Sequence, residues 1–485
     1  MHRITADSIA SLYDTAATRR IERDAAAALS PRTLMQRAGL AVARLAMAIA
    51  PDARTIWIAC GPGNNGGDGF EAATRLHQRG FGVVVTAVGA VDRMPDDARA
   101  SYEAARRAGV AFADAPPGNY ALAVDALLGI GRSREPEGQL ANWLRQMYGG
   151  TAPLLAVDLP SGLDADTGAH TLALQPTGSP RHCLALLTLK PGLFTAQGRD
   201  AAGEVWFDDL GCIPPKTEVP VARFEGRPAE HVSAHASHKG TRGDVAVVGG
   251  ASGMVGASRL AASAALHAGA GRVVVASLDP DSPMYDPVLP ELMFRRPEAL
   301  DSAASSTIVC GCGGGMAVRA VLPRVLSSAH ALVLDADALN AIALDASLQT
   351  QLRSRSARGW RTVLTPHPLE AARLLDKDTA TVQSDRLRAA MQLAENFGCT
   401  VVLKGSGTVI ATPGEPPAIN LTGNARLATA GTGDVLAGMI GARLASGQSA
   451  SVAARDAVWQ HGALADHWPA TSALTASALA RGSGG

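Results

Sequence analysis

Two series of short apolar runs, each alternating with helical stretches, constrain the fold of this 485-residue chain more than any other feature. The first series is TIWIAC, VVVTAVG, ALAVDALLG, LLAVDLP, CLALLTL and EVWFDDL; the second is DVAVVGG, RVVVAS, STIVCG, ALVLDAD, TVLTP and TVVLKGSGTVIAT. Runs that are apolar throughout indicate strands buried on both faces, and the intervening helical stretches indicate βαβ crossovers. We therefore predict two three-layer α/β domains, each built on a mostly parallel sheet.

A proline-rich stretch separates the two series. Residues 211–230 read GCIPPKTEVPVARFEGRPAE, with four prolines and no helical period, which is typical of a domain joint. No sequence repeat relates the two halves, so we predict unrelated domains at residues 1–222 and 223–485. We expect the C-terminal tail, ARGSGG, to be disordered.

Composition excludes several classes of function. Lys plus Arg and Asp plus Glu both number 44, and only 4% of residues are aromatic, which argues against nucleic-acid and membrane-surface partners. The charged N-terminal segment lacks the apolar core of a signal peptide, and we find no uncharged apolar run of about 18 residues that would span a bilayer. The six cysteines are scattered without zinc-site spacing. These features predict a cytoplasmic protein with reduced thiols.

The first glycine-rich turn, GPGNNGGDGF at residues 61–70, follows the first apolar run. Its glycines let the backbone approach a ligand, and the N-terminus of the following helix favours an anion. The turn satisfies G-x-G-x-x-G, but no acidic residue ends the next strand before Asp92, which argues against a nicotinamide dehydrogenase. Asn64, Asn65 and Asp68 add oxygens that suit a cation or a sugar hydroxyl better than a bare pyrophosphate. A tight turn without a ligand is the alternative.

Two further polar turns follow later strands of the first series. Asp125 ends ALAVD before a Gly-x-Gly, and Asp158 ends LLAVD three residues before Ser161. Each aspartate alone is also typical of a helix cap or a turn. Because open α/β sheets bind ligands at the carboxyl ends of their strands, Asn65, Asp125, Asp158 and Ser161 together predict one site.

The motifs GPGNNGGDG, DALLGIG and VDLPSGLDADTG resemble those of the NAD(P)H-hydrate epimerase family, over almost the whole first half. The resemblance implies a Rossmann-like fold, Asp158 as the catalytic acid and base, and a potassium ion held by Asn65, Asp125 and Ser161. The residues that it implies as contacts of the hydrated dinucleotide are Asn64, Asn65, Gly66, Gly67, Asp68, Gly129, Ile130, Gly131, Arg132, Ser133, Arg134, Glu135 and Asp158.

The second half carries different glycine-rich turns. The sequence Gly431-Thr-Gly433-Asp434 opens an apolar helix, where successive backbone N–H groups form a nest for a phosphate. Residues 404–408, KGSGT, lie in a predicted hairpin suited to a nucleotide phosphate or ribose. His367 lies between two prolines and is interpreted either as a ligand contact or as a rigid turn residue. No Walker A motif occurs.

These stretches resemble the ADP-dependent NAD(P)H-hydrate dehydratase family, which has a ribokinase-like fold, over nearly the whole second half. The resemblance implies Asp434 as the catalytic base and adenine-nucleotide contacts at Lys404, Gly405, Ser406, Gly407, Thr408 and Gly433. It implies hydrate contacts at Ala257, Gly313, His367 and Asp434. Residues 311–315, GCGGG, and 424–427, NARL, depart from the family's usual G-P-G-L-G and N-P-G or N-A-G-M steps, which bears on the contact assigned to Gly313.

Together the two resemblances predict a bifunctional enzyme for small-molecule substrates, NADHX and NADPHX. Its first half would interconvert the R and S hydrates, and its second would dehydrate the S form with ADP or ATP, with Mg²⁺ accompanying the nucleotide. We also expect a homo-oligomer. The alternatives are a vitamin or sugar kinase fused to a dinucleotide-binding regulatory domain, and a first half that only binds a ligand or acts as a scaffold. Net phosphoryl transfer to hydroxymethylpyrimidine or sugars, and epimerisation by the first half, discriminate between these readings.

Overall fold

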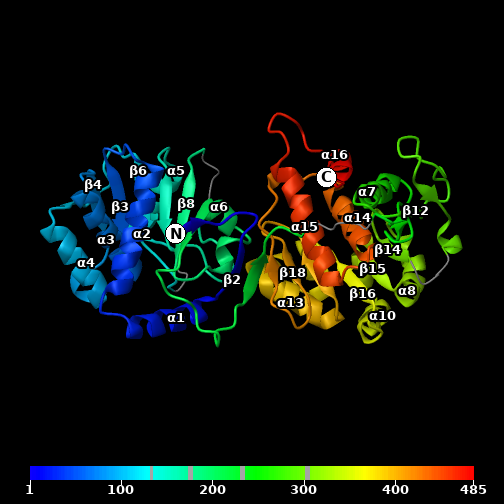
Figure 1. Cartoon of the computed structure of the whole chain (residues 1–485), viewed down its shortest axis with the longest axis horizontal. Coiled ribbons are helices and arrows are strands. Elements are labelled where there is room, and N and C mark those ends of the chain that lie inside the picture. Colours follow the sequence, from blue (N-terminus) through cyan, green and yellow to red (C-terminus); the bar gives the residue numbers. More distant parts are fainter. Residues whose placement is uncertain (132–134, 173–177, 230–234, 301–305, 485) are drawn as a thin grey trace. The chain divides into compact units, whose positions relative to one another are not determined.

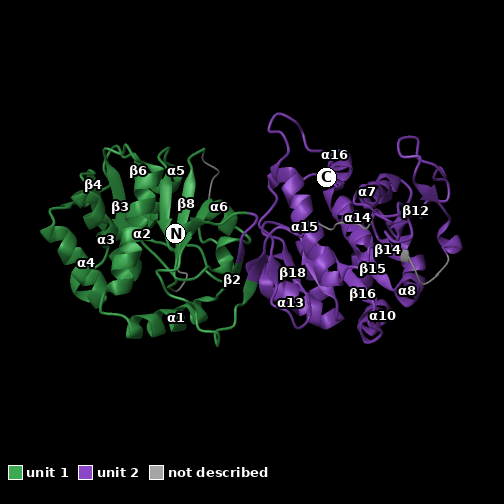
Figure 2. Cartoon of the chain, in the orientation of Figure 1, with its two compact units in different colours: residues 1–5, 10–222 green, residues 6–9, 223–485 purple. Residues whose placement is uncertain are grey.

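The chain forms two compact units, each built around one large sheet (Figures 1 and 2). The first unit comprises residues 1–5 and 10–222, and the second comprises residues 6–9 and 223–485. The computed structural model describes residues 1–131, 135–172, 178–229, 235–300 and 306–484.

The first unit contains an eight-stranded sheet in the order β1-β9-β8-β7-β6-β3-β4-β5. All its strand pairs are parallel except β1 with β9. In this order the strands are β1 His2–Arg3, β9 Glu204–Asp208, β8 Arg181–Leu186, β7 Leu154–Val157, β6 Leu122–Ala126, β3 Ile56–Cys60, β4 Val83–Ala87 and β5 Ala111–Phe112. Each apolar run of the first series is a strand, and the strand order reverses between β3 and β6.

Helices cover both faces of this sheet. On one face Ile56, Ile58 and Cys60 pack in a core with α1, α2, α3 and α4, and on the other Trp57 and Ala59 pack against α5. The helices of this unit are α1 Thr15–Ala28, α2 Thr33–Ile49, α3 Asn64–Gln78, α4 Asp96–Arg107, α5 Gly138–Gly149 and α6 Gly198–Ala202. The alternation of strand faces thus divides one buried run between two helix layers.

The sheet of the second unit has eleven strands in the order β13-β12-β11-β14-β15-β16-β17-β18-β19-β10-β2. The first seven strands in this order, from β13 through β12 and β11 to β17, pair in parallel. The pairs β17–β18 and β18–β19 are antiparallel. The strands are β13 Met293–Phe294, β12 Arg272–Ser277, β11 Asp244–Gly249, β14 Ser306–Cys310, β15 Ala331–Leu334, β16 Arg361–Leu364, β17 Thr400–Leu403, β18 Val409–Ala411, β19 Ala418–Ile419, β10 Ala222–Glu225 and β2 Ile9–Leu12. Here the strand order reverses between β11 and β14.

One face of the second sheet packs against α7, α14, α15 and α16 in a core rich in valine and alanine. Two further helices also contact the sheet: α13 contacts β17 and β18, and α10 contacts β16. The helices are α7 Val255–His267, α8 Val318–Ser328, α9 Asp337–Ala343, α10 Ala346–Ala357, α11 Pro368–Leu375, α12 Thr379–Ser384, α13 Arg386–Phe397, α14 Thr432–Ala445, α15 Ala450–Asp466 and α16 Ala476–Gly482. The predicted α/β fold class of both halves is confirmed. Within the described residues, no helix is both long and apolar enough to cross a membrane.

The prediction of a disordered C-terminal tail was wrong. Helix α16 includes Ala480–Gly482, and Ser483 is only 2% exposed, with its Oγ donating to Ala264 O at 3.2 Å. Leu479 and Ala480 are fully buried against the core that contains α7. Small residues near the C-terminus permit this close packing. Their low hydrophobicity is the reason that the sequence predicted disorder.

Candidate active sites

A cavity of about 590 Å³ lies at the carboxyl edge of the first sheet, where the strand order reverses. Reversal points of parallel sheets are where α/β folds bind ligands, because the two adjacent connections leave in opposite directions. The start of α3, the loop after β6 and the loop after β7 contribute to its wall. Of the residues predicted as substrate contacts, those that line the cavity are Asn64, Asn65, Asp68, Gly129, Ile130, Gly131 and Asp158.

Other predicted contacts lie elsewhere. Gly66 and Gly67 are buried within α3, and a Cβ on Gly66 would lie 1.9 Å from Gly61 O, so Gly66 closes the turn on itself. Glu135 is exposed and is not part of the cavity wall. The predicted contacts at Arg132, Ser133 and Arg134 lie outside the described residues.

Asp125, Ser161 and Asn65 lie around the loop that follows β6. The buried carboxylate of Asp125 accepts from Ser161 Oγ at 2.6 Å and from Ser161 N at 2.9 Å. Burial raises the pKa of Asp125, and these hydrogen bonds oppose the rise. Asn65 is 8% exposed, packs against Gly129, and neither its Oδ1 nor its Nδ2 has a hydrogen-bond partner among the described residues. An unsatisfied buried amide is costly, so this site calls for a further group.

Asp158 directly follows β7 and has a left-handed backbone conformation, with φ of 65°. Its Oδ1 accepts from Leu186 N at 3.1 Å and forms an ion pair with Lys190 Nζ. Lys190 is 1% exposed, and its Nζ also donates to Leu186 O at 2.8 Å. The sequence analysis missed Lys190, although a lone lysine inside the run CLALLTLKPGLF was a signal for a buried partner.

In the second unit, Asp434 lies in the first turn of α14, after Gly431 in a left-handed conformation with φ of 89°. His461 Nε2 donates to Thr432 O at 2.9 Å, and this hydrogen bond stabilises the turn. Burial, followed by the charge of Asp335, raises the pKa of Asp434 to about 7. A carboxyl with this pKa is suited to accept a proton near neutral pH.

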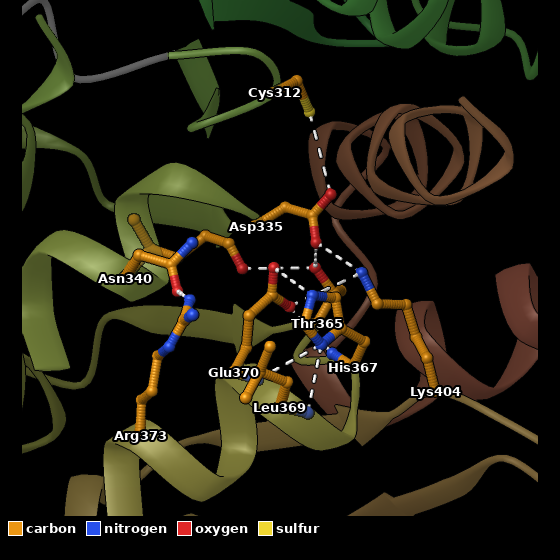
Figure 3. A network of polar contacts seen from close by, with 10 residues as sticks. Cys312, Asp335, Asn340, Thr365, His367, Leu369, Glu370, Arg373 and Lys404 are labelled. Carbon is orange, nitrogen blue, oxygen red and sulfur yellow. Dashed lines mark hydrogen bonds and ion pairs between the residues drawn. The ribbon is translucent and has the colours of Figure 1, made fainter. Parts of the chain in front are cut away.

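A buried polar network lies beside this turn (Figure 3). Lys404 Nζ is 2.8 Å from Asp335 Oδ1, and Thr365 Oγ1 donates to the same oxygen at 2.7 Å. Asp335 Oδ2 accepts from Cys312 Sγ at 4.0 Å. One ligand atom each from Cys312, Asp335 and Asp434 lies within 4.8 Å of the others. A Cβ on Gly433 would lie 3.4 Å from Lys404 Nζ, so the lysine reaches the glycine turn.

His367 has the turn role that its sequence context allowed, and its contact with the hydrate stays a prediction. It is the N-cap of α11, and its Nδ1 accepts from Leu369 N at 3.1 Å and from Glu370 N at 3.2 Å. A ring that accepts at Nδ1 carries its proton on Nε2 when neutral, and Nε2 is 3.2 Å from Glu370 Oε1. Burial raises the pKa of Glu370 to about 7. His367 is thus a fixed hydrogen-bond donor rather than a ready base.

Ala257 and Gly313 flank the reversal point of the second sheet, after β11 and β14 respectively. A Cβ on Gly313, whose φ is 57°, would lie 2.8 Å from the Cβ of Ala257, so the structure brings these two predicted contacts together. Ala251 N donates to Gly313 O at 2.7 Å. The departure at residues 311–315 therefore leaves the backbone of Gly313 beside Ala257.

The predicted nucleotide segment, residues 404–408, is the turn of the antiparallel hairpin β17–β18, as expected. Arg386 stabilises this turn, because its Nη2 donates to Leu403 O at 3.2 Å and to Lys404 O at 3.1 Å. Gly405 has a φ of 132°, which a side chain would disfavour.

Sequence reasoning missed Cys312, Asp335, Thr365 and Glu370. Asp335 follows the run ALVL, so the argument applied to Asp125 and Asp158 would have found it. Cys312 was interpreted only as a buried reduced thiol, and it is a free buried cysteine. Thr365 and Glu370 flank His367, and nothing in their local pattern indicated that they turn toward Asp335.

Comparisons with known proteins identify the family of the chain. Residues 31–192 match the family described as YjeF-related protein N-terminus, and residues 245–481 match the family described as NAD(P)H-hydrate dehydratase. The chain is 36% identical over 465 residues to the bifunctional NAD(P)H-hydrate repair enzyme of Escherichia coli (strain K12), which covers 92% of this chain and 88% of that enzyme. The chain belongs to the bifunctional NAD(P)H-hydrate repair enzyme family. The predicted family is confirmed.

Relatives of the second unit alone also occur outside the bifunctional NAD(P)H-hydrate repair enzymes. The ADP-dependent (S)-NAD(P)H-hydrate dehydratase of Neisseria meningitidis serogroup B is 43% identical over 252 residues, covering 50% of this chain and 83% of that protein. The ADP/ATP-dependent NAD(P)H-hydrate dehydratase of Bacillus subtilis, co-crystallised with ATP and Mg²⁺, is 31% identical with a TM-score of 0.44, covering 52% of this chain and 91% of that one.

Proposed function

We propose that this chain repairs hydrated NADH and NADPH with two active sites. The first unit interconverts the R and S hydrates, and the second removes water from the S hydrate with an adenine nucleotide, ADP or ATP. The observation that carries this proposal is the match of both halves, in one chain, to a bifunctional repair enzyme over 92% of its length. The two clusters of buried carboxyls, one per unit, supply chemistry for each reaction.

In the first unit we assign the acid and base role to Asp158. The hydrate carries a hydroxyl on C6 of the reduced nicotinamide ring, beside the ring nitrogen. Loss of water gives an iminium-like centre that this nitrogen stabilises, and water then returns to the other face. Asp158 lines the cavity, and both of its bonds from the protein fall on Oδ1, so Oδ2 is available for proton transfer. Asn64 and Gly129–Gly131 would hold the dinucleotide.

A potassium ion fits the loop after β6. The unpaired Oδ1 of Asn65, the carboxylate of Asp125 and Ser161 Oγ form a set of buried oxygens, which are the ligands that a hard cation prefers. The ion would supply positive charge beside the diphosphate of the substrate. Asp125→Ala should abolish the K⁺-dependent rise in melting temperature that we expect of the wild type, with Na⁺ as the matched control. An equal K⁺ response in both proteins would contradict this site.

In the second unit we assign the base role to Asp434 and the nucleotide site to Lys404–Thr408 and Gly433. The hydroxyl oxygen on C6 attacks the terminal phosphoryl group, its proton passes to Asp434, and the shortened nucleotide leaves, AMP from ADP or ADP from ATP. The C6–O bond then breaks to release phosphate while water takes the C5 proton, and the C5–H electron pair forms the C5–C6 double bond. Lys404 and the N–H groups of the glycine turn would stabilise the transferred phosphoryl group. Mg²⁺ would enter with the nucleotide phosphates.

Incubation of a mixture of R and S hydrates with ADP tests the proposal directly. The absorbance of NADH or NADPH should rise to the value expected for conversion of all the hydrate. The first unit converts the R hydrate into the S hydrate, which the second unit consumes. Omission of ADP is the control, in which R and S should equilibrate without absorbance recovery. Net phosphorylation of a sugar or vitamin without cofactor recovery would contradict the proposal.

Two sequence-based expectations stay predictions. A homo-oligomer is tested by light scattering of the purified chain, and a cytoplasmic location by fractionation of cells that express it.

A further inference from the structure

Four carboxyl groups line the cavity of the first unit, those of Glu22, Asp68, Asp97 and Asp158, together with the ammonium group of Lys190. Asp158 forms the ion pair with Lys190. The proposed epimerisation uses Asp158 alone, so it leaves Glu22, Asp68 and Asp97 without an assigned role in proton transfer.

Asp68 lies in the second turn of α3 and is partly buried. Within the described part of the chain, its carboxyl makes no hydrogen bond or ion pair. The charged groups that act on it are Asp158 across the cavity, Glu22 of α1 and Glu71 of its own helix. Burial first, and then these three like charges, raise the pKa of Asp68 well above its usual range. Burial and these like charges therefore favour the protonated form of Asp68.

Glu22 differs from Asp68 in its neighbours. Burial raises its pKa as well, but the positive charges of Lys190 and Arg19 oppose the rise. Among the residues that the structure describes, no such cation acts on Asp68. Carboxyl groups whose surroundings separate their protonation states are the usual acid and base of an active site.

Epimerisation involves proton transfer on both faces of the nicotinamide ring, which two catalytic groups serve better than one. A hydroxyl must leave one face of the ring as water, and a new water must add to the opposite face. A single carboxyl on one face can remove and return water on that face, but this exchanges oxygen without inverting C6. Asp158 after β7 and Asp68 on α3 come from different elements, and both line one cavity.

We propose that Asp68 is the second catalytic acid and base of the epimerase, acting on the ring face opposite Asp158; this inference rests on the proposed function. The proton of Asp68 passes to the departing hydroxyl, the C6–O bond breaks, and the lone pair of the ring nitrogen forms the C6–N double bond. Water then adds to C6 from the other side and gives its proton to Asp158, while the electron pair returns to nitrogen. For the other epimer the two carboxyls exchange roles, and solvent restores their protons between turnovers.

Oxygen exchange in H₂¹⁸O tests this arrangement in the full-length protein without ADP, so that dehydration does not occur. Purified R or S hydrate is incubated with enzyme, and both inversion and ¹⁸O incorporation are followed by chromatography and mass spectrometry, after subtraction of the enzyme-free rate. The wild type should invert either epimer with incorporation of ¹⁸O.

Asp68→Asn should slow inversion by about 10²–10⁴-fold, the usual value of one acid–base group. Exchange should continue in only one epimer, the one whose hydroxyl faces the intact Asp158. Glu22→Gln is the matched comparison, because it removes a carboxyl from the same cavity; it should not separate exchange from inversion. If Asp68→Asn melts below the assay temperature, Asp68→Ala is judged by the same ratio of exchange to inversion.

Inversion at the wild-type rate in Asp68→Asn would overturn the inference. Equal loss of exchange and inversion in a folded variant would also overturn it, since Asp158 alone should still exchange oxygen on its face. Separation of the two rates in Glu22→Gln but not in Asp68→Asn would assign the role to Glu22 instead. Absence of inversion in the wild type would contradict the proposed function itself.

Discussion

At the scale of single residues, aspartate side chains differ in burial and in their charged neighbours, and these differences change their acid–base chemistry. Asp158 has the buried ammonium of Lys190 beside it, whereas Asp68 faces other carboxylates. Asp434 is buried near the charge of Asp335, which raises its pKa to about 7. Removal of a carboxyl from water disfavours its charged form, and an adjacent ion either opposes or adds to that effect. Position in the fold therefore raises the pKa of Asp68 and of Asp434.

Replacement of Asp434 by asparagine should nearly abolish dehydration. Asparagine keeps the shape of the side chain but accepts no proton, so we expect a loss of about 10²–10⁴-fold in dehydratase turnover. ADP should still bind, and epimerisation should be normal. Because the acid form of Asp434 increases as pH falls through about 7, wild-type dehydratase kcat/KM should decrease below that pH. Both are measured by the return of reduced-cofactor absorbance; turnover of Asp434→Asn near the wild-type rate would show that the base is elsewhere.

His461 should make the second unit less stable in mild acid. Burial lowers its pKa to about 4 in the folded protein, whereas an unfolded histidine titrates near 6.5. Between these values the unfolded chain binds the proton and the folded chain does not, so folding stability is lost as pH falls. Between pH 7 and pH 5 this loss is about 2 kcal/mol.

The comparison for His461 is His461→Gln, which keeps a side-chain donor near Thr432 O. Denaturant unfolding of the second unit at the two pH values isolates the effect, because the acidic groups contribute equally to both proteins. The variant should show a smaller decrease in its free energy of unfolding from pH 7 to pH 5. The same decrease in both proteins would show that His461 is not the group that titrates.

At the scale of elements, helices α7 and α14 of the second unit pack closely enough to exclude a side chain. A Cβ on Gly438 of α14 would lie 2.0 Å from Ala261 O of α7. Both helices carry predicted site residues, Ala257 at the start of α7 and Asp434 at the start of α14. The short distance between the helix backbones thus positions the proposed hydrate contact, Ala257, relative to the proposed base, Asp434.

Gly438→Ala should therefore destabilise the second unit by about 1–3 kcal/mol, the usual cost of overpacking a core. It should also lower dehydratase activity, because the start of α14 must move. Gly256→Ala in α7 is the matched control: no atom lies within 4 Å of a Cβ built there, so alanine should be neutral or slightly stabilising. Thermal unfolding measures both variants, and equal melting temperatures would contradict the close packing.

At the scale of the whole molecule, the two sites lie in separate compact units of one chain. Each set of proposed catalytic residues comes from one unit only, Asp158 from the first and Asp434 from the second. The two reactions should therefore respond separately to mutation, although they are linked through the S hydrate that one produces and the other consumes.

Asp158→Asn tests this separation with a mixture of both hydrates. Dehydration of the S form should proceed at the wild-type rate, since its site is intact. Recovery of the reduced cofactor should then stop near half, apart from slow spontaneous epimerisation of the R form. Absorbance against time gives both values. Fast and complete recovery would remove Asp158 from the mechanism.

Local sequence determined the strands, the glycine turns and the family. Apolar runs are buried wherever they occur, and a turn such as GTGD requires a left-handed glycine whatever surrounds it. The same local signals placed Asp125, Asp158 and Asp434 at the ends or starts of elements. These features depend on neighbours in the chain, and so they can be read from the sequence.

Only the tertiary structure decided which side chains meet. Lys190 reaches Asp158 across 32 positions in the chain, and Lys404 reaches Asp335 across 69. It also decided that, within the described part of the chain, cations act on Glu22 but not on Asp68. The packing of the small residues near the C-terminus against α7 was decided in the same way. A protonation state or a close contact depends on burial and on charges brought together by the sheet order, and neither is encoded in any local pattern.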